Sequence, residues 1–162
     1  MLILWAVGIA VILLFGFTAF FGAPFLPTLS KRTNDALVLL DLKKGELLLE
    51  LGSGDGRLLL AAAKQGIHSI GYELNPLLVW YSRLRLWRYR KIAKVYVANY
   101  WNIDLPKAQG IYVFLLQPYM EKLDKKLLQS KITPVKLVSF AFTIPNKKPV
   151  REVNGMRLYL YK

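Results

Sequence analysis

Three glycines and two acidic residues carry the most specific chemical signal in this sequence. Gly52, Gly54 and Gly56 follow an apolar run that contains Glu50, and Glu73 ends the next apolar run. Glycines let the backbone turn sharply and approach a ligand closely, and a helix that begins there directs free N–H groups at the ligand. A carboxylate at the end of the second strand can accept hydrogen bonds from both hydroxyls of a ribose. The spacing therefore predicts a site for a ligand that contains a nucleoside.

The position of the third glycine distinguishes between nucleoside cofactors. A dinucleotide fingerprint, G-x-G-x-x-G, would place it at residue 57, and that residue is Arg57. The sequence instead reads G-x-G-x-G, with an acidic residue on each of the two flanking strands. This pattern resembles the S-adenosylmethionine (SAM) site of class I methyltransferases, so we expect SAM as the cofactor. The alternative is a degenerate or purely structural strand–helix–strand unit.

The elements that must position this site follow from the hydrophobic pattern. Continuous apolar runs are typical of buried parallel strands, and Asn75-Pro76 suits the start of a helix. The expected order is strand 46–51, helix 55–65, strand 67–73, helix 76–91, strands 92–98 and 111–116, helix 121–129, strand 135–142 and a hairpin over 150–161. We therefore expect an α/β fold of the class I methyltransferase (Rossmann-like) type over residues 46–162. Its sheet should be mostly parallel, with an antiparallel C-terminal hairpin.

The N-terminal residues predict a membrane anchor. Residues 2–23 contain no charged side chain and are long enough to cross about 30 Å of hydrocarbon. A cleaved signal peptide would require a basic segment before the apolar run, and none is present. A buried core helix is also a poor explanation, because such a helix would not need to be apolar on every face. Lys31 and Arg32 follow the run. The sequence thus predicts one transmembrane helix over 1–23, preceding the α/β domain, and a single-pass protein whose catalytic domain lies on the cytoplasmic side.

A connector should join this anchor to the domain over residues 24–45. Pro24 and Pro27 predict a stiff juxtamembrane segment. The apolar spacing over 28–42 then predicts an amphipathic helix that ends before Gly45. In class I methyltransferases a helix in this position often caps the cofactor pocket. The alternative is that it only covers one face of the sheet.

Composition narrows the chemistry and the partners. The 162 residues include 23 Lys or Arg, 10 Asp or Glu and no Cys, which gives a net charge of +13. Without Cys there is no disulfide, thiolate metal site or Cys nucleophile, and we expect no metal. The charge favours an anionic membrane face or a nucleic acid, or is a solvated basic surface. Gln117-Pro118-Tyr119 is only faintly similar to the Asp/Asn-Pro-Pro-Tyr motif of amino-group methyltransferases, and the chain has no room for a target-recognition domain. Nucleic acid is therefore an unlikely partner.

Residues 80–91 have an unusual composition for a crossover helix. Five basic residues alternate with four aromatic ones in this stretch. Such a pattern is typical of a membrane interface, where aromatic rings lie at head-group depth and arginines contact phosphates. It also fits RNA contact through phosphates and stacking. The simplest alternative is a helix with aromatic side chains in the core and solvated arginines.

Polar and aromatic side chains follow the third and fourth strands, at the edge where open α/β sheets bind ligands. The amide oxygen of Asn99 is suited to reading the adenine amino group. Methyl transfer from SAM requires proximity and alignment rather than a metal or a nucleophilic side chain. If the acceptor is an amine, aromatic side chains can hold its methylated cation. The candidate catalytic residues are Asn99, Trp101, Gln117, Pro118 and Tyr119, whose alternative role is packing at the sheet edge.

The assembled motifs resemble a narrower family: small, membrane-anchored class I methyltransferases related to the mitochondrial lysine methyltransferases of the ATP synthase c subunit and the adenine nucleotide translocase. The resemblance covers residues 24–149 and rests on the segments 50–57, 71–76 with 80–83, Trp101 and 115–118. It implies that Glu50, Gly52, Gly54, Asp55 and Glu73 bind SAM. The full set of expected cofactor-binding residues is Glu50, Gly52, Ser53, Gly54, Asp55, Gly56, Glu73, Leu74, Asn99 and Tyr100.

The resemblance also implies a function. We expect a membrane-anchored SAM-dependent methyltransferase that N-methylates lysine on a membrane-protein substrate. One alternative keeps the enzyme but makes the acceptor a lipid amine or a quinone. Another is a non-catalytic basic module, on a methyltransferase fold, that binds a membrane surface or RNA.

Overall fold

A seven-stranded sheet forms the centre of the computed structural model, which describes residues 1, 4–5, 8, 30–130 and 132–162. Its strands are β1 (Leu47–Leu51), β2 (His68–Glu73), β3 (Ala93–Val97), β4 (Gly110–Phe114), β5 (Val135–Phe140), β6 (Arg151–Val153) and β7 (Met156–Tyr161). Their order across the sheet is β3-β2-β1-β4-β5-β7-β6. The first five strands run parallel, and β7 pairs antiparallel with both β5 and β6. The predicted α/β fold with a mostly parallel sheet and an antiparallel C-terminal hairpin is confirmed.

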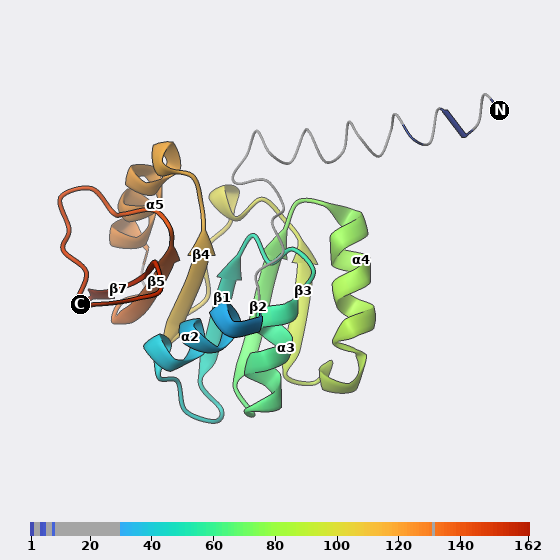
Figure 1. The fold of residues 1–162 in the computed structure, drawn as a ribbon, viewed down its shortest axis with the longest axis horizontal. Helices are drawn as coiled ribbons and strands as arrows, with labels where there is room; N and C mark the ends of the chain where they lie inside the picture. Colours follow the sequence, from blue (N-terminus) through green and yellow to red (C-terminus); the bar gives the residue numbers. More distant parts are fainter. Residues whose placement is uncertain (2–3, 6–7, 9–29, 131) are drawn as a thin grey trace.

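The strand register brings the candidate residues to one edge. Glu50 of β1 lies opposite Gly71 of β2 and Tyr112 of β4. Because β1 to β4 are parallel, the segments that follow them all leave from the same side of the sheet, at the top in Figure 1. Strand order reverses between β1 and β4, and ligands of open α/β sheets bind at such a switch point.

Helices cover both faces of the sheet (Figure 1). α2 (Ser30–Leu40), α3 (Arg57–Lys64) and α4 (Pro76–Arg85) pack on one face, in two adjoining apolar clusters that share α3. The helix α5 (Gln117–Gln129) covers the other face, where Met120, Leu123 and Leu127 are fully buried. Only the 3-10 turn η2 (Tyr100–Asn102) and irregular chain lie between β3 and β4 in this described region. A single helix therefore supports the second face beside the candidate site.

Local sequence signals explain where these elements begin and turn. Asn75 caps α4 by accepting hydrogen bonds from the N–H groups of Leu77 and Leu78, and Pro76 opens the helix. In the β6–β7 hairpin, Asn154 and Gly155 both have positive φ, of 51° and 79°, as a two-residue turn of this kind requires. The predicted Asn-Gly hairpin turn is confirmed.

Three predicted helices differ from the structure in extent, and one of them, expected over 121–129, is α5, which already begins at Gln117. The helix expected over 76–91 ends at Arg85 and is followed by the 3-10 turn η1 (Trp87–Tyr89), because the Leu86 side chain turns into the core between α3 and β3. The amphipathic helix expected over 28–42 is α2, which contacts α3 and strands β4, β5 and β7. It covers a face of the sheet, and its role as a cap over the cofactor pocket stays a prediction.

The predicted single-pass membrane localisation, with the domain on the cytoplasmic side, is contradicted. Among the described residues no helix is long and apolar enough to cross a membrane. The longest of them, α5, has 13 residues, which extend about 20 Å, against about 30 Å of hydrocarbon. Residues 2–3, 6–7 and 9–23 of the predicted span, and residues 24–29 of the predicted connector, lie outside the described part of the chain.

Gly71 is required by packing between β2 and the glycine-rich turn. A Cβ at this position would lie 2.6 Å from Cβ of Ser53 and 2.6 Å from a methyl carbon of Leu59. Cβ of Ser53 is bonded to the backbone of the turn, so it cannot move aside cheaply. We expect Gly71→Ala to lower the free energy of unfolding by about 1–3 kcal/mol, as overpacked cores do.

The measurement is chemical denaturation of the two chains at the same pH. The matched control is His68→Ala on the same strand, where the side chain is exposed and the change should stay within about 0.5 kcal/mol. Equal stability of Gly71→Ala and the unmodified chain would show that the turn has room to shift.

Candidate active site

The glycine-rich turn after β1 is held by backbone geometry that favours glycine. Gly52, Gly54 and Gly56 all have positive φ, of 85°, 51° and 73°. The N–H groups of Gly52 and Ser53 both donate to the carbonyl of Tyr72, at 2.9 and 3.0 Å. A Cβ at Gly56 would lie 2.9 Å from Oγ of Ser82, so α4 packs directly against the turn. The turn is therefore fixed between β2 and α4.

Glu73 connects the end of β2 to both neighbouring elements. Its Oε2 accepts a hydrogen bond from the Gly54 N–H and its Oε1 accepts one from the Asn75 N–H, each at 2.9 Å. Each carboxylate oxygen can accept a further hydrogen bond. The side chain is only partly buried. It thus has both the position and the remaining acceptor capacity to hold two ribose hydroxyls.

The carboxyl group of Glu50 is buried, and within the described part of the chain one of its oxygens lacks a hydrogen bond that would offset the loss of water. Only 6% of the residue is exposed, and its Oε2 has no hydrogen-bond partner among the described residues. Burial raises the pKa of its carboxyl well above the ordinary value, and the nearby charges of Asp55 and Glu73 raise it further. An acidic group in this condition requires a hydrogen-bond donor or a cation to become stable as an anion.

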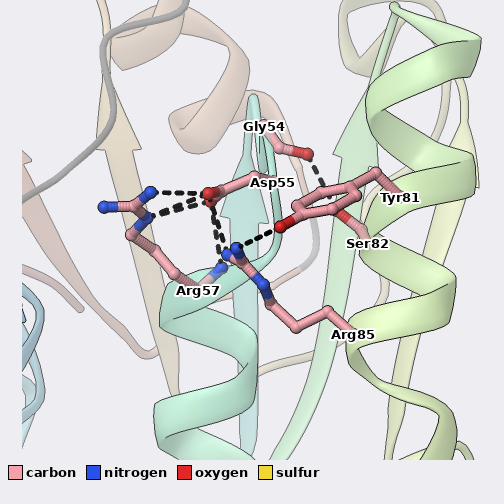
Figure 2. A network of polar contacts seen from close by, with 6 residues as sticks. All are labelled: Gly54, Asp55, Arg57, Tyr81, Ser82 and Arg85. Atoms are coloured by element: carbon pink, nitrogen blue, oxygen red, sulfur yellow. Dashed lines mark hydrogen bonds and ion pairs between the residues drawn. The ribbon is translucent and has the colours of Figure 1, made fainter.

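Asp55 lies in the opposite electrostatic environment. Figure 2 shows its carboxylate between the guanidinium groups of Arg57 and Arg85, at 2.6 and 2.8 Å. Burial opposes ionisation of Asp55, but the hydrogen bonds and charges of the two arginines outweigh it, so its pKa lies below the usual value. On the other side of the same turn, Oγ of Ser82 donates to the carbonyl of Gly54 at 2.8 Å. These contacts attach the turn to α3 and α4.

Three aromatic rings gather where the segments after β3 and β4 meet. The rings of Tyr100 and Trp101 are 4.8 Å apart, and those of Trp101 and Tyr119 are 6.4 Å apart. Burial raises the pKa of Tyr100, and the nearby Glu73 and Tyr119 raise it further. The N–H of Ala98, two residues before Tyr100, donates to the carbonyl of Glu73 at 3.0 Å, so this group begins beside the end of β2. Nζ of Lys122 lies 4.5 Å from the centre of the Trp101 ring. The aromatic group therefore already holds one lysine ammonium.

The remaining predicted catalytic residues have structural partners. Oδ1 of Asn99 accepts from the Trp101 N–H at 3.0 Å and caps η2. The side-chain amide of Gln117 donates to the carbonyl of Thr143 and accepts from its N–H, at 3.0 and 3.1 Å. Pro118 is exposed in the first turn of α5. The structure thus brings Trp101 and Tyr119 together where the segments after β3 and β4 meet, whereas Gln117 joins α5 to the loop after β5.

Three buried polar atoms show what kind of ligand these residues can bind. Oε2 of Glu50, Oγ of Ser53 and Nδ2 of Asn75 lack partners within the described part of the chain. A Cβ built on the exposed Gly52 would meet no atom within 4 Å, so the turn opens to free space at this position. An open cradle, two acidic residues and unpartnered polar atoms match a ligand with hydroxyl and amine groups. Leu74, which follows Glu73, is half-buried and contributes apolar surface.

The sequence patterns did not predict several contacts that hold the candidate site together. Arg85 pairs with Asp55 from a distant position in the chain, and no local pattern indicates that contact. Lys126 donates from α5 to the carbonyl oxygens of Trp101 and Ile103, at 3.4 and 2.8 Å, and so holds the loop after β3. The N-cap Asn75 was identified as a helix start but not as part of the site. No group of His, Cys, Asp and Glu in the described ranges could hold a metal ion.

Comparison with known proteins gives one consistent picture. The chain is 36% identical over 128 residues to the human lysine N-methyltransferase of the ATP synthase c subunit, and the match covers 78% of this chain and 54% of that protein. It is 34% identical over 133 residues to the adenine nucleotide translocase lysine N-methyltransferase of Mus musculus, with 80% and 58% covered. The chain thus spans about half the length of these curated relatives.

A solved structure matches most of the fold. An RNA methyltransferase from Salinibacter ruber, crystallised with S-adenosyl-L-homocysteine, superposes with a TM-score of 0.76 at 26% identity, covering 84% of this chain and 92% of that one. The class I methyltransferase fold and SAM as its cofactor, both predicted from the sequence, are confirmed. The family model of the ANTKMT methyltransferase domain matches residues 50–151, which is more than half of the chain. The protein therefore belongs to the ANTKMT methyltransferase domain family.

Proposed function

We propose that this protein is a SAM-dependent methyltransferase that methylates the side-chain amine of lysine in a protein substrate. One observation carries the proposal: the aromatic group of Trp101 and Tyr119 follows the backbone contact between Ala98 and Glu73 and already holds the ammonium of Lys122 against Trp101. Aromatic faces attract ammonium groups, methylated ones included. A substrate lysine can use the same surface while its nitrogen faces the cofactor.

The cofactor roles follow from the contacts described above. Glu73 accepts hydrogen bonds from the two ribose hydroxyls, with its geometry set by Gly54 and Asn75. Glu50 accepts from the amino group of the methionine part, which supplies the cation that its buried carboxylate lacks. Asn99 faces the adenine, and its Nδ2 atom or remaining Oδ1 lone pair can contact the ring. Asp55 contributes by keeping the turn in place through the two arginines.

When bound, SAM supplies a methyl group already activated by its sulfonium. The residues of this chain have to orient the lysine nitrogen in line with that methyl group and keep water away from it. The lysine must first lose a proton to solvent, and a site with aromatic walls favours the neutral amine. No nucleophilic side chain is needed.

The relatives support lysine as the acceptor. Both curated relatives named above are lysine N-methyltransferases acting on proteins. The family model extends from residue 50 to residue 151 and therefore includes Glu50, Glu73, Trp101 and Tyr119. The S. ruber structure favours RNA as a second candidate acceptor, since the match covers nearly all of that chain.

The test uses the purified chain, SAM labelled on its methyl group, and an extract from cells that lack an active copy. Protein, RNA and lipid fractions are counted separately. Labelled protein is hydrolysed, and its amino acids are separated beside methyl-lysine standards. Label in methyl-lysine supports the proposal, whereas label only in RNA or in lipid overturns it.

Removing the Glu73 carboxylate should abolish cofactor binding. Glu73→Ala leaves the Gly54 and Asn75 N–H groups without their acceptor and removes both ribose contacts. Because hydrogen bonds to a charged group contribute about 1.5–3 kcal/mol each, we expect SAM affinity to fall at least about 100-fold. Isothermal titration calorimetry measures the change. Glu121→Ala, on the exposed face of α5, is the matched control, and near-normal affinity of Glu73→Ala would contradict the ribose assignment.

Glu50→Gln should change stability and cofactor affinity in opposite directions. Because the folded chain raises the pKa of Glu50, this group stabilises the fold fully below its ordinary pKa of 4.5 and loses that contribution as the pH rises through the raised value. Without cofactor, the variant should therefore be more stable than the unmodified chain at pH 8 and show a flatter pH dependence. SAM affinity should fall about tenfold or more, since a charged hydrogen bond is lost.

Thermal melting from pH 4 to pH 8 and calorimetry on the same samples separate the two effects. The control is Glu121→Gln, whose side chain is exposed. Unchanged affinity would exclude Glu50 as a cofactor ligand, and an unchanged pH profile would show that its carboxylate is not strained in the folded chain.

A further inference from the structure

The outer side of α4 exposes a line of large apolar side chains. Leu77, Trp80, Leu84 and Trp87 are 48%, 63%, 54% and 63% exposed, and we call these four residues the α4 outer face. The spacing of Leu77, Trp80 and Leu84 places them along one side of α4, and Trp87 follows in the 3-10 turn η1. Val79 and Ser82, on the opposite side, are buried against the sheet and the glycine-rich turn. In Figure 1, α4 lies at the margin of the fold beside the edge strand β3, with no described element outside it.

The surroundings of this face are strongly basic. Residues 74–103 contain no Asp or Glu and six Lys or Arg. Arg85 points inward to Asp55, whereas Arg88 and Lys91 are exposed. No acidic side chain in the described part of the chain pairs with either of these two. An apolar stripe thus lies beside cations that no internal anion neutralises.

A hollow adjoins the C-terminal end of the α4 outer face. It has a volume of about 310 Å³, and its wall includes Arg83, Arg90, Lys94, Trp87 and Tyr96. The guanidinium of Arg90 lies 4.5 Å from the Trp87 ring and donates to the Trp87 carbonyl. Arg83 donates to the carbonyl of Val95. Arginine side chains fixed beside aromatic rings can bind the phosphate of a ligand whose other part is apolar.

We propose that the α4 outer face is a peripheral docking surface for an anionic phospholipid membrane. Trp80 and Trp87 would lie at head-group depth with Leu77 and Leu84 beside them, and Arg88, Lys91 and the hollow would contact lipid phosphates. Tryptophan prefers this boundary because one part of its ring system is apolar and its N–H is polar. The contact is with the surface only and requires no membrane-spanning helix. The inference does not depend on the proposed methyl acceptor.

The other occupants explain fewer of the observations. RNA would use the arginines and the aromatic rings, but the half-exposed Leu77 and Leu84 offer no surface for base stacking. A second copy of the chain placed face to face would bring two uncompensated basic clusters together, which opposes association. A lipid surface satisfies both the aliphatic side chains and the charges.

The orientation has a consequence for the cofactor edge. α4 begins at Pro76, directly after Glu73 and its cap Asn75, so the N-terminal end of the docking surface adjoins the candidate active site. With α4 lying along the lipid head groups, the open edge of the sheet would border the membrane surface. Acceptors within reach would then be those near that surface.

The test records tryptophan fluorescence of the full chain with vesicles that contain brominated lipids, which quench only nearby rings. The chain has four tryptophans, so the Trp80→Phe/Trp87→Phe variant isolates the signal of the α4 outer face from any contact made by other segments. With vesicles rich in anionic lipid, we expect quenching that this variant loses. Vesicles of neutral lipid should quench much less.

Charge variants give a second, independent measurement. Arg88→Gln/Lys91→Gln should raise the lipid concentration needed for half-maximal quenching at least about tenfold, since each basic residue near the surface contributes to binding. The matched control is Lys107→Gln/Lys148→Gln, which removes two exposed lysines elsewhere. Leu128→Ser, at an exposed apolar residue of α5, is the control for hydrophobicity. Melting temperature and SAM binding verify that each variant is folded.

Each outcome decides the proposal. Absence of quenching at Trp80 and Trp87, or equal quenching by neutral and anionic vesicles, overturns it. A fluorescence change caused by an RNA oligonucleotide, with no effect of brominated lipid, would replace the membrane by a nucleic acid. If the tryptophan variant does not fold, the charge variants decide alone, and an unchanged lipid requirement overturns the proposal.

Discussion

One carboxylate, that of Glu73, joins the three elements on which the site depends. It ends β2, accepts from the backbone of the glycine-rich turn at Gly54, and accepts from the backbone of Asn75 where α4 begins. Ser82 of α4 holds the carbonyl of the same Gly54 from the other side. The turn is therefore fixed between a strand and a helix before any ligand arrives. Under the proposed cofactor assignment, a ribose would meet acceptors that are already in position, and little ordering would be left for binding to require.

Two carboxylates of similar sequence position have opposite roles because their surroundings differ. Asp55 is satisfied by Arg57 and Arg85 and serves as a tie between the turn and two helices. Glu50, a few residues earlier, is buried with one oxygen unpartnered and with like charges nearby. The chain thus retains an unfavourable group at the position where a cationic ligand group can compensate it. Under the proposed role of Glu50, stability lost in the free protein would be recovered as binding free energy when the ligand amine binds.

The sequence predicted those parts of the structure that local rules determine. The order of strands and helices along the chain, the Asn75 cap and the Asn-Gly hairpin all follow from short patterns. It could not predict where the helix after Asn75 ends, because that depends on Leu86 turning into the core. Nor could it predict the pairing of Gln117 with the Thr143 backbone, since contacts between distant segments leave no local signal. The predicted membrane localisation is wrong for a different reason: hydropathy and the position of basic residues supported it, and no described helix can cross a membrane.

The two sides of the candidate site are held by different parts of the fold. α3 and α4 fix the cofactor side through the glycine-rich turn. The acceptor side depends on α5, which supplies Tyr119, places Lys122 over the Trp101 ring and satisfies the Trp101 and Ile103 carbonyls with Lys126. This dependence arises because the chain between β3 and β4 is a 3-10 turn and irregular loop instead of a full crossover helix. Under the proposed roles, changes along the exposed side of α5 would therefore alter which acceptor fits and leave Glu50 and Glu73 in place for the cofactor.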